Sequence, residues 1–327
     1  MSQPPCLFAM QASRTWGEAV AAQLGTPLSP YEERAFDDGE HKMRPLASVR
    51  GRDVFVLQSL HGDDSQSVDD KLCRLLFFIG ALKDASAASV TAVVPYLPYA
   101  RKDRKTKVRD PVTTRYVAAL FESVGTDRVV TLDVHNLAAY QNAFRCRTEH
   151  LEAAGMFARH FATHLGAQPA VVVSPGASDM KRTGQFRERL ASALRRPVGA
   201  AFADDVRGEP AAGTDLIVGD VAGRCVIIVD DRIGTGATLA STARACRALG
   251  AAEVHAAATH GLFVSPAADL LADSGLDSIV VTDTVPPFRL PAGPVRDRLH
   301  VLPTAALFAA AISRMHTDAS LTELLGG

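Results

Sequence analysis

The stretch CVIIVDDRIGTGATL, residues 225 to 239, decides the fold. It predicts a buried strand, two adjacent acids, a turn rich in glycine and threonine, and a helix that begins near Ala237. Backbone N–H groups at a helix N-terminus bind a phosphate dianion, and Thr235 and Thr238 can add hydroxyl donors. The two acids can accept hydrogen bonds from neighbouring sugar hydroxyls. A phosphate beside a diol indicates ribose 5-phosphate as the ligand.

The same stretch has a simpler interpretation, a turn followed by a capped helix that binds nothing. A bare pair of aspartates or an isolated Gly-Thr-Gly would favour that interpretation. Here four apolar strand residues, both acids and two threonines share one register, which favours ligand binding. The residues expected at the sugar phosphate are Asp230, Asp231, Gly234, Thr235, Gly236, Ala237 and Thr238.

Short apolar runs alternate with Ala/Leu-rich amphipathic stretches along the rest of the chain, which predicts an α/β fold with parallel sheets. The expected strands are Val54–Gln58, Val90–Pro95, Arg128–Asp133, Ala170–Ser174, Cys225–Asp230, Glu253–Thr259 and Ser278–Thr282. The expected helices are Asp69–Asp84, Thr113–Ser123, Ala153–Leu165, Arg182–Leu194, Ala237–Leu249 and Ser265–Asp273.

A chain of 327 residues accommodates two α/β domains, since single cores stop growing near about 250 to 300 residues. We expect an N-terminal domain over 1–150 and a C-terminal domain over 151–327. A final helix near Thr304–His316 either packs back on the first domain or caps the second. The polar segment Asp204–Asp215 is expected to be a mobile loop beside the phosphate site.

The composition limits which partners and which cellular compartment we expect for the chain. The 35 basic and 36 acidic residues nearly cancel, so no global charge would hold the chain on nucleic acid or an anionic membrane. No window approaches about 18 uncharged apolar residues, which argues against a membrane span. The five cysteines show no zinc-site spacing, and we expect no signal peptide, so a reduced cytoplasmic protein is predicted.

Several motifs resemble one enzyme family. VIIVDDRIGTGATL is similar to the ribose-phosphate signature of type I phosphoribosyltransferases, and VVPYLPYARKDRKTK (93–107) resembles the ATP-contacting segment of ribose-phosphate pyrophosphokinases. Further matching motifs occur in the family's order and span nearly the whole chain. They are FDDGE (36–40), TLDVHN (131–136), VVSPGASDMKR (172–182), IVGDVAGR (217–224) and THGLF (259–263).

The resemblance implies two phosphoribosyltransferase-like domains, each a mainly parallel sheet flanked by helices. The implied reaction transfers the diphosphoryl group of Mg·ATP to the C1 hydroxyl of ribose 5-phosphate, which gives phosphoribosyl diphosphate and AMP for nucleotide biosynthesis. Mg²⁺ is the implied cofactor. Members of the family are homo-oligomers, commonly hexamers built from dimers.

For the ATP side, the resemblance implies that Phe36, Asp38 and Glu40 form part of an adenine pocket contributed by a neighbouring subunit. Without the other motifs, these three residues could equally form a surface turn. Arg101, Lys102 and Asp103 are implied to lie over the ATP phosphates.

A run of cations such as Arg101–Lys105 is usually a solvated surface, but after an apolar strand it can clamp polyphosphate. Binding of nucleic acid is not expected there, because acids interrupt the run and few aromatic residues accompany it. The resemblance implies that His135 is a magnesium ligand. By residue type alone, a histidine at a strand end is more often an ordinary hydrogen-bonding residue, since magnesium prefers oxygen.

Catalytic roles are expected for Lys181 and Arg182, at the start of the helix that follows VVSPGASDM, although helix surfaces often carry such pairs. Arg207 is expected to replace the arginine of the family's mobile loop. The chain departs from the family here, because Asp204 or Asp205 stands where a loop lysine is usual and Gly176 stands where an aspartate is usual. A carboxylate beside polyphosphate repels it.

Three hypotheses follow from these departures. The first is a working pyrophosphokinase with a rearranged loop. The second is a catalytically weak paralogue that assembles with and regulates an active synthetase. The third is a related enzyme with altered chemistry or a different sugar-phosphate acceptor.

Overall fold

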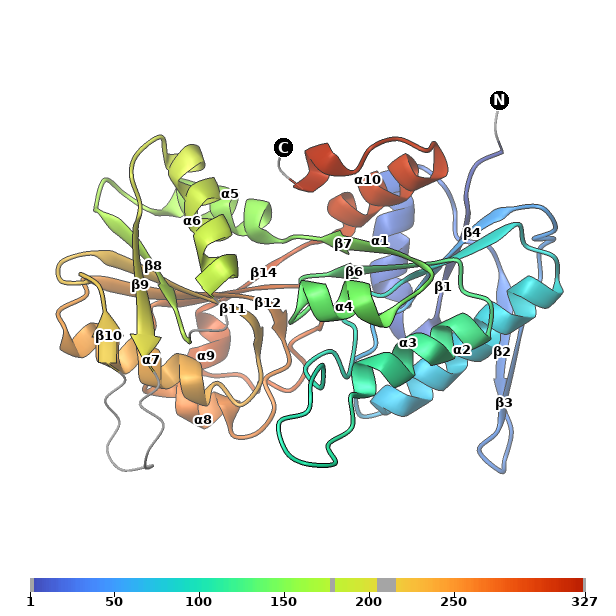
Figure 1. Cartoon of the computed structure of the whole chain (residues 1–327), viewed down its shortest axis with the longest axis horizontal. Helices are drawn as coiled ribbons and strands as arrows, with labels where there is room; N and C mark the ends of the chain where they lie inside the picture. Colours follow the sequence, from blue (N-terminus) through green and yellow to red (C-terminus); the bar gives the residue numbers. More distant parts are fainter. Residues whose placement is uncertain (1–2, 177–179, 205–215, 326–327) are drawn as a thin grey trace. The chain divides into compact units, whose positions relative to one another are not determined.

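The computed structural model describes residues 3–176, 180–204 and 216–325. The chain divides into two compact units (Figure 1). The first unit comprises Met1–Leu151 and Thr304–Gly327, and the second comprises Glu152–Pro303. The chain therefore leaves the first unit after Leu151 and returns to it for its last helix.

The first unit is built on a five-stranded sheet of order β1-β4-β5-β6-β7, and all of its strand pairs are parallel. Its strands are β1 (Cys6–Ala9), β4 (Asp53–Leu57), β5 (Ser89–Val93), β6 (Arg128–Leu132) and β7 (Arg147–Leu151). The helices joining them are α1 (Arg14–Leu24), α2 (Val68–Asp84), α3 (Thr113–Ser123) and α4 (Leu137–Ala143). Helices on both faces explain why the central strands are continuous apolar runs rather than alternating ones.

The second unit contains a seven-stranded sheet of order β10-β9-β8-β11-β12-β13-β14. Only the edge pair β10/β9 is antiparallel. Its strands are β8 (Ala170–Ser174), β9 (Gly199–Asp204), β10 (Leu216–Val218), β11 (Cys225–Ile233), β12 (Glu253–Gly261), β13 (Ser278–Thr282) and β14 (Leu299–Leu302). Figure 1 shows α5 and α6 on one face of this sheet and α7, α8 and α9 on the other. These helices are α5 (Ala154–His164), α6 (Met180–Leu194), α7 (Ala237–Ala248), α8 (Ala267–Ala272) and α9 (Pro294–Asp297).

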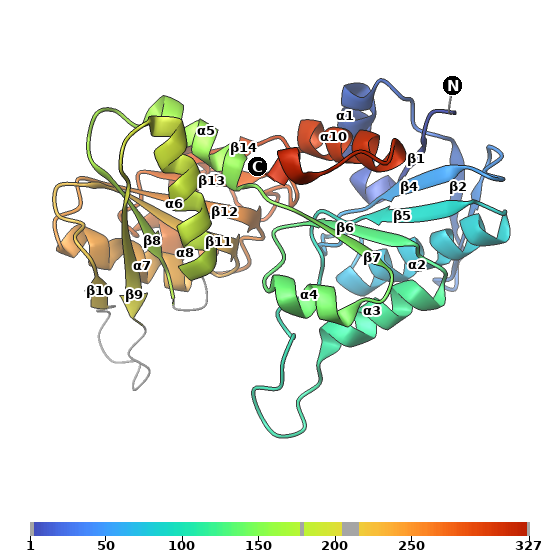
Figure 2. The same cartoon turned by 45° about the horizontal axis from the view of Figure 1, so that its top comes forward.

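The last helix, α10 (Ala305–His316), packs against α1 in the first unit (Figure 2). The indole Nε1 of Trp16 donates to Thr304 Oγ1 over 2.9 Å, and the Trp16 ring meets Phe308 edge-on at 5.1 Å. At the other end of the helix, His316 Nδ1 lies 2.8 Å from Asp53 Oδ2. Of the two placements that the sequence leaves open, the structure shows packing on the first unit.

The predicted strands and helices are all present, with small differences at their ends. The prediction that the strand ends at Asp230 was wrong. The strand β11 continues to Ile233 because Arg232 and Ile233 still pair with His260 and Gly261 of β12.

The sequence reading also missed an antiparallel hairpin, β2 (Tyr31–Ala35) and β3 (His41–Pro45). Its strands are polar and half-exposed, so they show no apolar run. In the part of the chain that the structure describes, no helix is both long and apolar enough to cross a membrane.

Candidate active site

The phosphate turn, residues 234–236, joins β11 to α7 in the second unit. Gly236 is the N-cap of α7 and has a φ of +75°. A Cβ at this position would lie 2.8 Å from Leu271 Cγ, so both the backbone and the packing require glycine. The first bond inside the helix runs from the Ala240 N–H to the Gly236 carbonyl, over 2.8 Å. The N–H groups of residues 237–239 precede that bond and are the donors that a helix N-terminus offers to an anion.

Hydroxyl groups surround this helix start. The side chains of Thr235, Ala237 and Thr238 are exposed, and Thr235 Oγ1 lies 3.4 Å from the Ala237 amide nitrogen. The carbonyl of Gly234 accepts from the Val264 N–H over 3.1 Å, which fixes the turn from below. Small residues, helix-start amides and threonine hydroxyls therefore lie together at this turn, and their binding of a phosphate stays a prediction.

The two acids before the turn differ in environment. Asp231 is buried, and Arg182 on α6 points Nη1 toward its Oδ1 at 3.6 Å. Asp230 is half-buried, and its Oδ1 accepts from the Asp231 N–H over 2.7 Å. Arg182 thus orients a carboxylate beside the phosphate turn, whereas its neighbour Lys181 is exposed.

One position at which the chain departs from the resembled family, Gly176, follows β8, the strand that pairs with β11. Ser174, at the end of β8, donates its hydroxyl to the Gly176 carbonyl over 2.5 Å, so the backbone takes part in the hydrogen bonding where a carboxylate is usual. Arg207, and the loop 205–215 in which we expect mobility, lie outside the described residues.

In the first unit, the loop that follows β5 is braced internally. Lys102 Nζ donates to Asp110 Oδ2 over 2.6 Å and to Thr106 Oγ1 over 3.2 Å. Asp110 also accepts from the backbone N–H groups of Thr106 and Lys107, at 3.1 and 3.0 Å. These donors, the Lys102 ammonium first, hold the pKa of Asp110 well below its usual range. Asp110 therefore fixes the loop as an anion.

Arg101, Arg104 and Lys105 are among the exposed cations of this loop. Among the described residues, no hydrogen bond or ion pair engages these three side chains. These three side chains can therefore bind a polyphosphate without breaking an internal contact. Lys102 serves the same loop by bracing it.

Acids and a histidine gather at the carboxyl ends of β5 and β6, which are neighbours in the sheet. Asn136 donates Nδ2 to Asp103 Oδ2 over 2.7 Å, and its own Oδ1 caps α4 by accepting from the Ala139 N–H. His135 is half-buried beside it, and Asp133 is buried with a φ of +44°.

Asp103 and Asp133 carry oxygen donors of the kind that magnesium prefers, and His135 carries an imidazole. Among the described residues, however, these three side chains do not bring their ligand atoms together as a metal-binding group.

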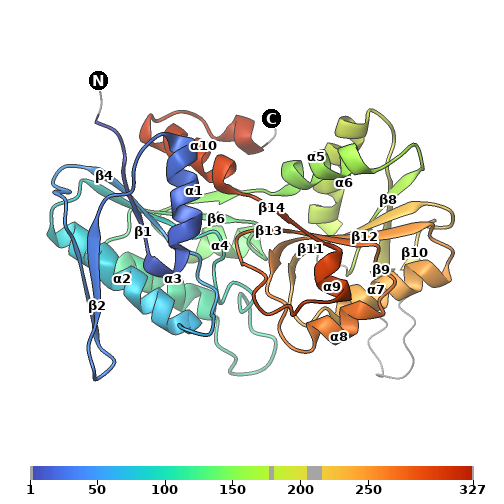
Figure 3. The same ribbon diagram turned by 180° about the vertical axis from the view of Figure 1, so that it is seen from behind.

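The residues expected near adenine form the turn between β2 and β3. The Phe36 ring is 40% exposed, and the guanidinium of Arg34 lies 5.2 Å from the ring centre. Asp38 Oδ1 accepts from the Glu40 N–H over 3.0 Å, so this carboxylate stabilises its own turn. The hairpin and the loop that follows β5, residues 94–112, lie on different sides of α2 and α3 (Figure 3). Within one chain, the expected adenine residues and the expected phosphate cations are therefore apart.

The comparisons with known proteins cover both units. A family model described as the N-terminal domain of ribose phosphate pyrophosphokinase matches residues 5–125, and one described as the phosphoribosyl synthetase-associated domain matches residues 210–326. The chain is 38% identical over 319 residues to the ribose-phosphate pyrophosphokinase of Caldanaerobacter subterraneus, covering 97% of this chain and 96% of that one.

Two further comparisons agree with this result. The chain is 36% identical over 320 residues to ribose-phosphate pyrophosphokinase 1 of Listeria innocua, covering 97% of this chain and 96% of that one. The crystal structure of phosphoribosylpyrophosphate synthetase from Mycobacterium smegmatis superposes with a TM-score of 0.86 at 34% identity, and covers 97% of this chain and all of that one.

Proposed function

The chain belongs to the ribose-phosphate pyrophosphokinase family, and we propose on that premise that it transfers the β,γ-diphosphoryl group of ATP to the C1 hydroxyl of ribose 5-phosphate. The products are phosphoribosyl diphosphate and AMP. The observation that carries this proposal is the phosphate turn, with its glycine N-cap, exposed hydroxyls and preceding acid pair. A polyphosphate loop in the other unit provides the second binding function that such a transfer needs.

Ribose 5-phosphate binds with its phosphate on the turn and helix start from Gly234 to Thr238. Asp230 and Asp231 accept hydrogen bonds from the ribose hydroxyls. Arg182 acts through Asp231 by orienting its carboxylate, and is a positioning residue. Asp230 has one oxygen bonded to a backbone amide and is half-exposed, so it remains within reach of the sugar.

The ATP phosphates bind to the loop after β5. Arg101 is the leading contact, with Arg104 and Lys105 beside it, because guanidinium groups match phosphate geometry. His135 would contribute to holding Mg²⁺, which neutralises charge on the phosphates when it is bound. Little covalent chemistry falls to the protein in such a transfer, so these residues act by alignment and by stabilising developing charge.

The separation of the adenine hairpin from the phosphate loop supports a homo-oligomer. A complete nucleotide site then takes Phe36, Asp38 and Glu40 from one copy and Arg101 from another. Dimer-based assembly, including a hexamer, follows from that sharing. A cytoplasmic location is part of the same proposal, since none of the five cysteines forms a disulfide bond in the described structure.

The loop departure at Asp205 gives the test that separates this function from its alternatives. Purified protein is incubated with Mg·ATP, with and without ribose 5-phosphate, and AMP is measured beside an Asp205→Lys variant. The proposal expects AMP from the native protein only when the sugar phosphate is present. A silent native protein with an active Asp205→Lys variant would identify a disabled regulatory relative. AMP formation only with another sugar phosphate would identify altered chemistry.

A further inference from the structure

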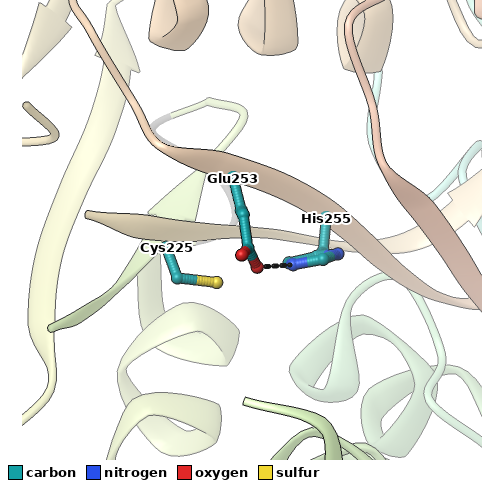
Figure 4. A group of neighbouring side chains, drawn as sticks. All are labelled: Cys225, Glu253 and His255. Atoms are coloured by element: carbon teal, nitrogen blue, oxygen red, sulfur yellow. Dashed lines mark hydrogen bonds and ion pairs between the residues drawn. The ribbon is translucent and has the colours of Figure 1, made fainter. Parts of the chain in front are cut away.

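A second cluster of chemically active side chains lies at the other end of the second unit's sheet. Cys225 and Glu253 are the first residues of β11 and β12, whereas the phosphate turn follows the last residue of β11. Cys225 pairs with Glu253 across the two strands, and His255 is two residues along β12. Because side chains alternate between faces with a period of two, all three project from the same face of the sheet. Figure 4 shows them side by side.

The three side chains come close enough to share one ion. One possible ligand atom from each, the sulfur, a carboxylate oxygen and a ring nitrogen, all lie within 4.8 Å of one another. His255 Nε2 is 3.2 Å from Glu253 Oε2. Bond lengths to zinc are about 2.0 to 2.3 Å for these donor types, so small side-chain rotations suffice to enclose an ion.

A serine on the neighbouring strand orients the ring of His255. Its Nδ1 lies 2.8 Å from the hydroxyl of Ser278 on the neighbouring strand β13. When Nδ1–H donates to that oxygen, the lone pair of Nε2 faces the carboxylate of Glu253. Histidines that bind metals are commonly fixed in this way, with the second ring nitrogen donating to an oxygen.

Burial and charge favour a cation at this place. Cys225 is buried, His255 is nearly buried, and the Glu253 side chain is 44% exposed, so the carboxylate marks the route of entry. A carboxylate oxygen of Glu253 lies within 4.8 Å of the Cys225 sulfur, and its negative charge favours a cation beside the thiol. Binding would form a metal–sulfur bond and release the thiol proton to solvent.

We propose that Cys225, Glu253 and His255 bind a zinc ion, with water as the fourth ligand, and so tie together the amino ends of β11 and β12. Sulfur and nitrogen ligands suit Zn²⁺, whereas Mg²⁺ requires oxygen ligands in octahedral geometry. The site is distinct from the phosphate turn, and an ion bound there would link the neighbouring strands β11 and β12.

A histidine group nearby supplies the competing location for an ion. The rings of His160 and His164 on α5 stack at 4.2 Å, and the ring of His300 lies 5.4 Å from that of His160. His164 and His300 are exposed. An ion held by these histidines would not depend on Cys225, so variants distinguish the two locations.

The test uses metal-free protein titrated with Co²⁺, because a cysteine thiolate bound to cobalt gives a charge-transfer band. We expect this band in the native protein, its displacement by Zn²⁺ and no displacement by excess Mg²⁺. Cys225→Ser removes the band, and Glu253→Gln and His255→Gln weaken binding. Ser278→Ala weakens binding about 10- to 100-fold, as expected for a partner that orients a ligand.

Cys73→Ser is the matched control for the thiol, since Cys73 is a half-buried cysteine in the first unit. His164→Gln is the control for the histidine group. Both controls should keep the band, and zinc should raise the melting temperature of the native protein but not of Cys225→Ser. Absence of the band in native protein, its persistence in Cys225→Ser, or its loss in His164→Gln would overturn the proposal. If Cys225→Ser does not fold, Glu253→Gln tests the proposal instead, because the Glu253 side chain is 44% exposed. Cobalt binding as tight as in the native protein would then overturn the proposal.

Discussion

At the scale of single residues, two glycines of the phosphate turn make a controlled comparison. Gly236→Ala places a Cβ 2.8 Å from Leu271 Cγ at a φ of +75°, whereas a Cβ at Gly234 meets nothing within 4 Å. We expect Gly236→Ala to lower the free energy of unfolding by about 1–3 kcal/mol and to weaken ribose 5-phosphate binding. Gly234→Ala should change both far less. Denaturant unfolding and calorimetric titration measure the two effects, and equal behaviour of the variants would contradict this account of the turn.

The cations of the 94–112 loop also have different expected roles. Arg101→Ala should raise the KM for ATP and lower kcat/KM by at least about tenfold, because a charge-assisted contact to phosphate is worth roughly 1.5–3 kcal/mol. Lys107→Ala, an exposed cation of the same loop, is the matched control and should be nearly silent. Steady-state kinetics with varied ATP gives the comparison. Equal losses in the two variants would show that only the net charge of the loop matters.

At the scale of elements, helix α5 carries a pH-dependent contribution to stability. Burial first, and then the neighbouring His164, His300 and His255, lower the pKa of His160 to about 4. In the unfolded chain, His160 takes up a proton near pH 6.5, the ordinary histidine pKa of about 6.5. In the folded protein, it takes up that proton only near pH 4. The contribution of His160 to the free energy of unfolding is therefore fully present above about pH 6.5, and it is lost as the pH falls from about 6.5 to 4.

Urea unfolding of the native protein and of His160→Gln at a series of pH values measures that contribution. The native free energy of unfolding should fall more steeply than that of the variant between about pH 6.5 and 4. Parallel curves would show that His160 titrates normally in the folded protein.

The elements that were predicted well from the sequence are those whose buried residues are consecutive in the chain. Val54–Leu57 and Val226–Ile228 are fully buried, so they appear in the sequence as unbroken apolar runs. The β2/β3 hairpin could not be found in this way, because its strands are polar and half-exposed. The end of β11 was predicted too early because an acid pair often follows the end of a strand. The actual end is set by pairing with β12, which is distant in the sequence.

At the candidate site, too, local features could be predicted from the sequence, whereas contacts between distant residues could not. The conformation of the turn at residues 234–236 was predictable, because glycine, hydroxyl residues and the helix start are adjacent in the sequence. The ion pair of Arg182 with Asp231 joins residues far apart in the sequence, and the contact of Lys102 with Asp110 depends on how the loop closes. Periodicity likewise shows that α10 has an apolar face, but not that this face meets Trp16 of α1.

At the scale of the whole molecule, the proposed sharing of the nucleotide site predicts complementation between copies. Phe36→Ala damages the adenine side and Arg101→Ala damages the phosphate side, which belong to different chains in one site. After the two variants are mixed under conditions that exchange subunits, some sites have both sides intact. The activity of the mixture should exceed the mean of the separate variants. A mixture that only matches this mean would indicate that each chain builds its own site.

The central claim is that an intact diphosphoryl group moves from ATP to ribose 5-phosphate. The most direct measurement uses ATP labelled in either the β- or the γ-phosphate, with the native protein, Mg²⁺ and ribose 5-phosphate, and follows the label into the sugar product. The account predicts that both labels appear in that product in equal amounts and that AMP is released. Transfer of the γ label alone, with ADP as the product, would contradict it and show an ordinary sugar-phosphate kinase.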